Sequence, residues 1–133
     1  MRVDTHVGLL LPVPRANVVN TALPAAEASL ISADLVAISN SFPKTVASTY
    51  STYQVSTFRV YVCISVAGIL RVARTLLVGG VMVEDLNGGA ALVPSVAYMF
   101  EIEVRAGDKI NLRYSVTTGT IYTLRVDEVG MRG

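Results

Sequence analysis

The sequence predicts an all-β fold: a two-sheet antiparallel β-sandwich of the jelly-roll type, with eight or nine short strands and an extended N-terminal arm. Two observations lead to this prediction. Apolar and polar residues alternate along four stretches of the second half of the chain, and turn-forming residues recur between strands at roughly 8–12-residue spacing. A period of two places the apolar side chains of each strand on one face, as in a sheet that is buried on one side.

Residues 1–28 differ from the rest and are predicted as an arm, with the sandwich domain at residues 29–133. Pro12 and Pro14 each favour extended geometry in the residue before them. Two interpretations remain open: the segment is the first strand of its own sandwich, or it lies on a neighbouring subunit and adds a strand to that subunit's sheet. In the second case the predicted intersubunit contacts are Val7, Leu9, Leu11 and Val13.

The segment after Pro24 has no clear period. It suits either a short helix with Thr21 near its cap or a turn that leads into a strand over residues 30–38. The β-rich remainder of the chain favours the strand.

Residues 35–58 carry only one charged side chain, Lys44. We expect a loop around Pro43 and then a strand edge rich in threonine and tyrosine. A surface so poor in charge is weakly protected against association, so a partner is expected to cover it. Tyr50 and Tyr53 are the predicted contacts there.

Glycine-containing turns mark the boundaries of most of the remaining predicted strands. Residues 57–66 alternate regularly, Gly68 precedes a strand over 69–78, and Gly79-Gly80 turns into a strand over 81–86. Asn87-Gly88 is the strongest hairpin signal, because a type I′ turn needs two positive φ angles. The last three strands are expected at 98–105, 110–116 and 122–127. Five aromatic side chains fall on core-facing positions: Phe58, Tyr98, Phe100, Tyr114 and Tyr122.

If these last three strands pair as a meander, Glu101 and Glu103 face Arg113 and Arg125 as cross-strand ion pairs.

The composition limits the classes of function. Charged residues make up 16% of the chain and the mean hydropathy is +0.52, which is unusually apolar for a soluble monomer. No apolar run approaches the ~20 residues of a helical membrane span, so we expect a subunit that buries apolar surface against neighbours. A net charge of +1 without a basic run disfavours nucleic-acid binding. The first residues lack the features of a signal peptide, which predicts a protein made and assembled in the cytoplasm.

Catalysis and cofactor binding are not expected. The one histidine, His6, lies in the arm, and Cys63 lies in the middle of a strand, where an inert thiol is expected. Carboxylates cluster at Glu84-Asp85, Asp108 and Asp127-Glu128, and oxygens of this kind could bind calcium. They lack the spacing of a calcium loop, so solvated turn carboxylates are the favoured interpretation.

Several segments, taken together, resemble small β-sandwich modules of tailed phages and other viruses. They are residues 22–28, Phe58-Arg-Val-Tyr-Val with Ile69-Leu-Arg-Val, and the tail over 97–116 and 121–129. The resemblance covers about residues 22–129. It implies non-enzymatic subunits of the capsid decoration, cement or tail-associated kind, often trimeric, whose N-terminal arms grip their neighbours.

We therefore expect a structural subunit that self-associates, with a trimer favoured, and that builds or decorates a virion. Its expected partners are copies of itself and a capsid or other assembly protein, with no nucleic acid, membrane, metal or cofactor. Two alternatives remain open: a filament or pilus-like subunit that donates its arm as a strand, and a lectin-like jelly roll that binds a ligand.

Overall fold

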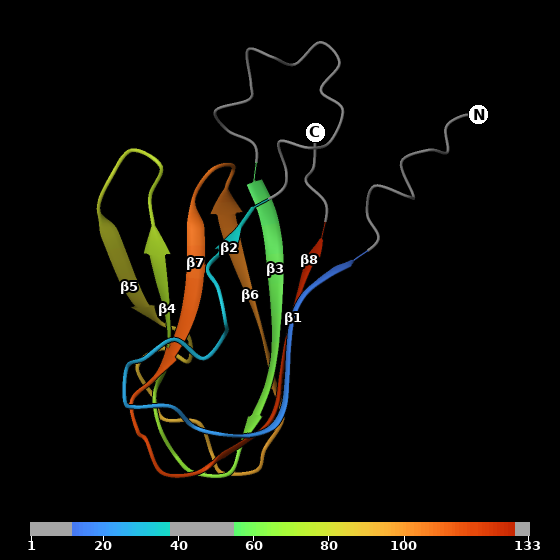
Figure 1. Cartoon of the computed structure of the whole chain (residues 1–133), viewed down its shortest axis with the longest axis vertical. Coiled ribbons are helices and arrows are strands. Elements are labelled where there is room, and N and C mark those ends of the chain that lie inside the picture. The colour runs from blue at the N-terminus through green and yellow to red at the C-terminus, as the bar shows by residue number, and fades with distance from the viewer. Residues whose placement is uncertain (1–11, 38–54, 130–133) are drawn as a thin grey trace, which may run out of the picture.

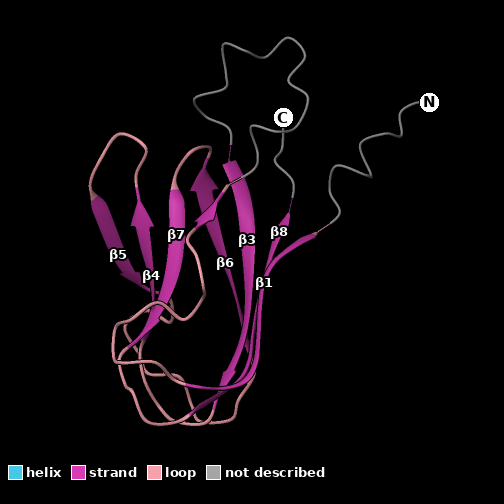
Figure 2. Cartoon of the chain, in the orientation of Figure 1, coloured by secondary structure: helices cyan, strands magenta, loops and turns pink. Residues whose placement is uncertain are grey.

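A computed structural model describes residues 12–37 and 55–129 (Figure 1). These residues form two four-stranded antiparallel sheets packed as a sandwich, which confirms the predicted fold class (Figure 2). The first sheet has the order β1-β8-β3-β6, with β1 at Val13–Ala22, β8 at Thr120–Val129, β3 at Val55–Ile64 and β6 at Tyr98–Arg105. The second has the order β2-β7-β4-β5, with β2 at Leu35–Val36, β7 at Lys109–Tyr114, β4 at Leu70–Thr75 and β5 at Val81–Asp85.

The strand pairing shows the jelly-roll winding directly. The first strand pairs with the last, β1 with β8, and the pairs continue inward as β2 with β7, β3 with β6 and β4 with β5. The β3–β8 and β4–β7 pairs then join these four ribbons into two sheets. This is the arrangement expected when one long antiparallel ribbon is rolled into a sandwich.

Much of the predicted arm belongs to the sandwich. β1 pairs with β8 of the same chain from Val13 to Ala22, which is the first of the two interpretations of this segment. The chain then crosses to the other sheet and runs along β7, where the Glu27 and Leu30 amides donate to the carbonyls of Tyr114 and Leu112. The described residues therefore show no boundary between an arm and a domain at residue 28.

The core lies between the sheets and follows the predicted alternation. The inward side chains of β3, Phe58 to Ile64, are 0–2% exposed, and their outward neighbours are half-buried. The inward face of β7 is buried in the same way, as are Ile102 and Val104 of β6. Tyr98 and Phe100 are half-buried and stack with their ring centroids 5.7 Å apart.

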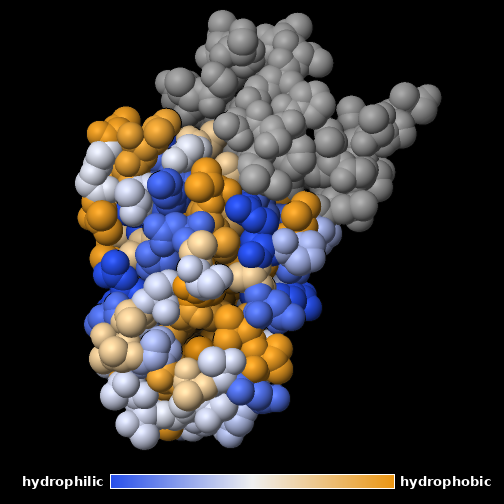
Figure 3. All heavy atoms as spheres, in the orientation of Figure 1, coloured by the Kyte–Doolittle hydropathy of each residue, from blue (hydrophilic) through white to orange (hydrophobic). Residues whose placement is uncertain are grey.

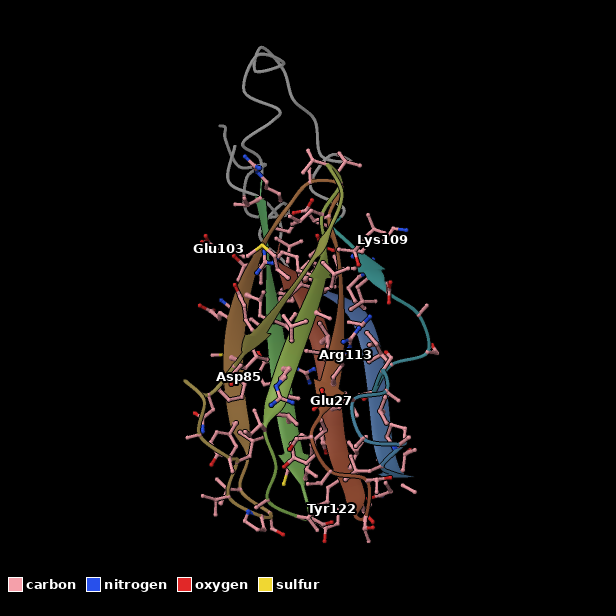
Figure 4. All side chains as sticks on the ribbon, turned by 90° about the vertical axis from the view of Figure 1, so that its left-hand side faces the viewer. Glu27, Asp85, Glu103, Lys109, Arg113 and Tyr122 are labelled. Carbon is pink, nitrogen blue, oxygen red and sulfur yellow. The ribbon has the colours of Figure 1, made fainter. Side chains whose placement is uncertain are left out.

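The prediction for Tyr122 is wrong. Its side chain is 41% exposed, whereas the adjacent Ile121 is buried (Figure 4). The β3–β8 pairing shifts register at this point, since Cys63 pairs with Thr123 but Ile64 pairs with Ile121. An extra residue in one strand reverses the faces of all residues beyond it, so the alternation read backwards from Leu124 fails at Tyr122.

The Asn87-Gly88 signal also has a different outcome. Gly88 and Gly89 do adopt positive φ angles of 63° and 85°, and residues 86–89 form a turn. No strand follows directly, because residues 90–97 cross from the second sheet to the first before β6 begins. Similarly, the predicted strand over residues 30–38 shortens to β2, and the segment after Pro24 forms a turn.

Alkaline pH is expected to destabilise the protein through Tyr114. Burial, with a smaller contribution from Tyr98, raises the pKa of its hydroxyl to about 12, from about 10 in an unfolded chain. Between these values the unfolded chain ionises and the folded protein does not, so stability that is present below pH 10 is lost as pH rises towards 12. The loss is about 2–3 kcal/mol by linkage, measurable by denaturant unfolding at several pH values. Tyr114→Phe should remove this part of the pH dependence; an unchanged slope would contradict it.

Candidate assembly surface

β4 and β5 form a hairpin whose exposed side chains are unusually apolar. Gly79 and Gly80, with φ angles of 112° and 92°, turn the chain between the two strands. The hairpin surface, as we call it, consists of Leu77, Val78, Val81, Met82 and Val83, which are 72%, 88%, 58%, 47% and 49% exposed. Figure 3 shows apolar side chains gathered over this corner of the molecule.

The position of β5 explains why these side chains are exposed but not why they are apolar. β5 is an edge strand, and each of its five residues is exposed. A strand that covers a core has one buried face, so an edge strand usually carries polar residues on the other face. Here Val81 and Val83 lie on one face and Met82 on the other, and all three reach solvent. This gathering of exposed apolar side chains at one edge of a sheet makes the hairpin surface a candidate interaction surface.

A buried carboxylate holds the hairpin loop in place. The Leu77 amide donates to Asp108 Oδ1 over 2.8 Å, and Asp108 is buried in the turn between β6 and β7. Gly107, with a φ angle of 92°, lets this turn approach closely, since a Cβ there would lie 2.8 Å from Leu77 Cδ2. A hollow of about 280 Å³ lies between the two turns. The prediction of a solvated carboxylate at Asp108 is therefore wrong, because the turn packs on the neighbouring hairpin.

The two acidic residues of β5 are paired with arginines of β4. Asp85 accepts from Arg71 Nε over 2.8 Å, and Glu84 lies 3.6 Å from Arg74 Nη2. Arg71 also pairs with Glu27 on the outer face of the sheet (Figure 4), and Glu27 and Asp85, in that order, raise the pKa of its guanidinium. These cross-strand pairs hold the two carboxylates of β5 next to arginines of β4. The exposed residues of β5 that remain outside such pairs, Val81–Val83, are apolar.

Asp127 and Glu128 are also buried, contrary to the prediction of solvated groups. Glu128 points into the sandwich, is fully buried and pairs with Arg15 of β1, whose guanidinium carbon lies 5.7 Å from the Phe58 ring centroid. Asp127 points to the opposite face and accepts from Arg125 over 3.0 Å. Both residues lie within β8, close to its C-terminal end, so they are strand residues rather than turn residues.

The last three strands do not pair as the meander considered above. β6 and β8 lie on either side of β3, and β7 lies in the other sheet. Glu101 therefore pairs with Arg59 of β3 over 2.9 Å, and Arg125 covers the Tyr61 ring at 4.4 Å. Arg113 faces Arg71 across the β4–β7 pair instead of a glutamate.

A second recess runs along the free edge of β1. It is a groove of about 490 Å³ between residues 15–21 of β1 and residues 31–35. Its lining mixes polar and apolar groups, among them Asn17, Val19 and Thr21.

The structure bears on only part of the predicted contact set. Val13 begins β1 opposite Glu128 and is 37% exposed. The other predicted contacts, Val7, Leu9, Leu11, Tyr50 and Tyr53, lie outside the described residues, as does His6. The hairpin surface was missed by the sequence-based prediction, although the signal is present: six large apolar residues, Leu76–Val78 and Val81–Val83, flank a Gly-Gly turn.

The described residues hold no cluster of three or more histidine, cysteine or acidic side chains arranged for a metal ion. Cys63 is half-buried on the outer face of β3. The described residues contain no helix long and apolar enough to cross a membrane. Comparison with known proteins gives no further assignment: no protein family model matches the sequence, and no curated protein matches it significantly.

Proposed function

We propose that this protein is a non-enzymatic structural subunit that self-associates and builds or decorates a virion. The observation that carries the proposal is the hairpin surface, which places five large apolar side chains in solvent around an edge strand. Their burial between subunits would stabilise an assembly by roughly 25 cal/mol for each Å² of apolar area removed from water.

Two further features support this function. The jelly-roll winding is found in viral capsid domains, as it is in lectins and cupins, so it supports a virion role by analogy. Several charged side chains of the sandwich are engaged in structural pairs, such as Arg59 with Glu101 and Arg71 with Asp85, which join neighbouring strands.

The first test is the mass of the purified chain in solution. We expect light scattering over a range of concentrations to give an oligomer well above the 14.2 kDa of one chain. A variant with Val81→Lys and Val83→Lys should fall to the monomer mass, because two ammonium groups per subunit cannot be buried in an apolar contact. A monomer at high concentration for the unaltered chain would refute self-association.

A matched control is Val19→Lys, since Val19 is 53% exposed on another edge strand and lies outside the hairpin surface. Its mass should equal that of the unaltered chain. A chain without residues 1–11 retains β1 and measures separately the contribution predicted for Val7, Leu9 and Leu11. Electron microscopy of the assembled material distinguishes closed particles from the rods of a filament subunit, and a glycan array with calcium tests the lectin alternative.

A further inference from the structure

We infer that two copies of this chain join through their β5 strands, antiparallel about a two-fold axis at Met82, so that their β2-β7-β4-β5 sheets become one eight-stranded sheet. This inference rests on the proposed self-association and specifies its contact.

Among the described edge strands, β5 is the least protected, because its first three residues, Val81–Val83, are all apolar. β1 contains Pro14, a register shift at Arg15 and a positive φ angle at Asn20, all of which disturb strand addition. β2 is two residues long, and β6 carries charged side chains at alternate positions on its exposed face, Glu101, Glu103 and Arg105. β5 pairs with β4 without a bulge and contains no proline.

The hydrogen-bond pattern shows which backbone groups of β5 point outward. Leu76 donates to Gly80 and Leu86 donates to Leu70, at the two ends of the β4–β5 ladder. Because ladder bonds alternate along an antiparallel pair, the even-numbered residues of β5 bond to β4 and the odd-numbered ones face away. No described strand lies on that side of β5. Val81, Val83 and Asp85 therefore direct their amides and carbonyls towards a strand added there.

The side chains favour one register for a second copy. With the axis at Met82, Val81 of one copy faces Val83 of the other in a hydrogen-bonded pair, and the two Met82 side chains face each other. Glu84 of each copy then lies opposite Gly80 of the other. Because Gly80 has no side chain, no apolar group covers either of the two Glu84 carboxylates. With the axis at Val83, Glu84 would face Met82 and Asp85 would face Val81. The first register joins apolar to apolar residues and keeps acidic groups apart, which cross-strand pairing favours.

Disulfide formation tests this register. Opposed residues at a non-hydrogen-bonded position have Cα atoms about 4.5 Å apart, which a disulfide can span. In a Cys63→Ser chain, Met82→Cys should therefore form a covalent dimer under mild oxidation. Val83→Cys should not, because its diagonal counterpart lies about 7–8 Å away, and Val19→Cys controls for an exposed cysteine elsewhere. Dimer formation by Val83→Cys but not by Met82→Cys would overturn the register.

Proline at position 83 tests the strand pairing itself. The Val83 amide points away from β4, so Val83→Pro removes an outward donor and leaves the hairpin ladder intact. Because both copies in the symmetric pair carry the substitution, two intersubunit hydrogen bonds are lost. We expect self-association to weaken about 10–30-fold. Val83→Thr, which keeps the amide, should weaken it less, and circular dichroism should show that both variants are folded.

The outcomes separate this inference from the proposed function. If the chain is oligomeric but Val83→Pro leaves the dissociation constant of self-association unchanged, the β5 contact is refuted and self-association stands. A trimer would require a head-to-tail contact and would also overturn the two-fold arrangement. If the unaltered chain is a monomer, both proposals fail.

Discussion

Arg15→Ala is expected to lower the free energy of unfolding by about 3–5 kcal/mol, a large share of the 5–15 kcal/mol typical of a domain. Arg15 joins β1 to the fully buried Glu128 of β8, and its guanidinium lies over the Phe58 ring. Without the arginine, the Glu128 carboxylate stays inside the sandwich and loses this counter-charge. Denaturant unfolding followed by circular dichroism measures the loss.

A double variant separates the cost of removing this counter-charge from the value of the Arg15–Glu128 ion pair. Replacing both partners with apolar residues, Arg15→Met with Glu128→Leu, removes the charge along with its partner and should recover most of the stability. If the double variant is as unstable as Arg15→Ala, the arginine acts through its packing on Phe58 rather than through the buried carboxylate.

Tyr114→Ala is expected to cost a similar amount, about 3–5 kcal/mol, because it empties a large volume of the core. Tyr114 is 1% exposed and is among the largest fully buried side chains. Its hydroxyl also donates to the Val66 carbonyl over 2.7 Å, so the variant leaves this acceptor without that donor. Thermal or denaturant unfolding should show the loss, and Tyr114→Phe, which keeps the ring, should lose about 1 kcal/mol.

Gly68 provides the control for the packing part of this prediction. A Cβ at Gly68 would lie 2.6 Å from Tyr114 Cε2, so Gly68→Ala alone should cost about 1–3 kcal/mol by overpacking. In the Tyr114→Ala chain the same change meets an empty space and should cost little. Additive effects of the two changes would show that the ring does not restrict residue 68.

Local patterns predicted well the strands that alternate between a core face and an outer face. β3, β6 and β7 each have one face against the core, so the period of two was visible in Phe58–Ile64 and its counterparts. Two kinds of information were missing. A bulge such as the one before Leu124 shifts the phase without a marker in the sequence. Pairing between distant strands, which separated Glu101 from Arg113 and Arg125, depends on the winding and not on local spacing.

The candidate site was harder to predict than the fold. The apolar residues on both sides of Gly79-Gly80 are visible in the sequence, but an apolar residue on an edge strand looks the same there as one in the core. The exposure of Val81 and Val83 therefore became apparent only when β5 was placed at the edge of its sheet. The burial of Asp108 and Glu128 was also hidden in the sequence, because each residue has a partner far along the chain. Asp108 accepts from the Leu77 amide, and Glu128 pairs with Arg15.

The central place of β8 in its sheet has a consequence for biosynthesis. β8 lies between β1 and β3 and is made after the other seven strands. On the ribosome, β1 therefore waits for its neighbour until translation has passed residue 129, whereas the β4–β5 hairpin can close much earlier. A nascent chain thus exposes the apolar hairpin surface before the sandwich is complete, and aggregation through an uncovered edge strand is favoured most in that interval.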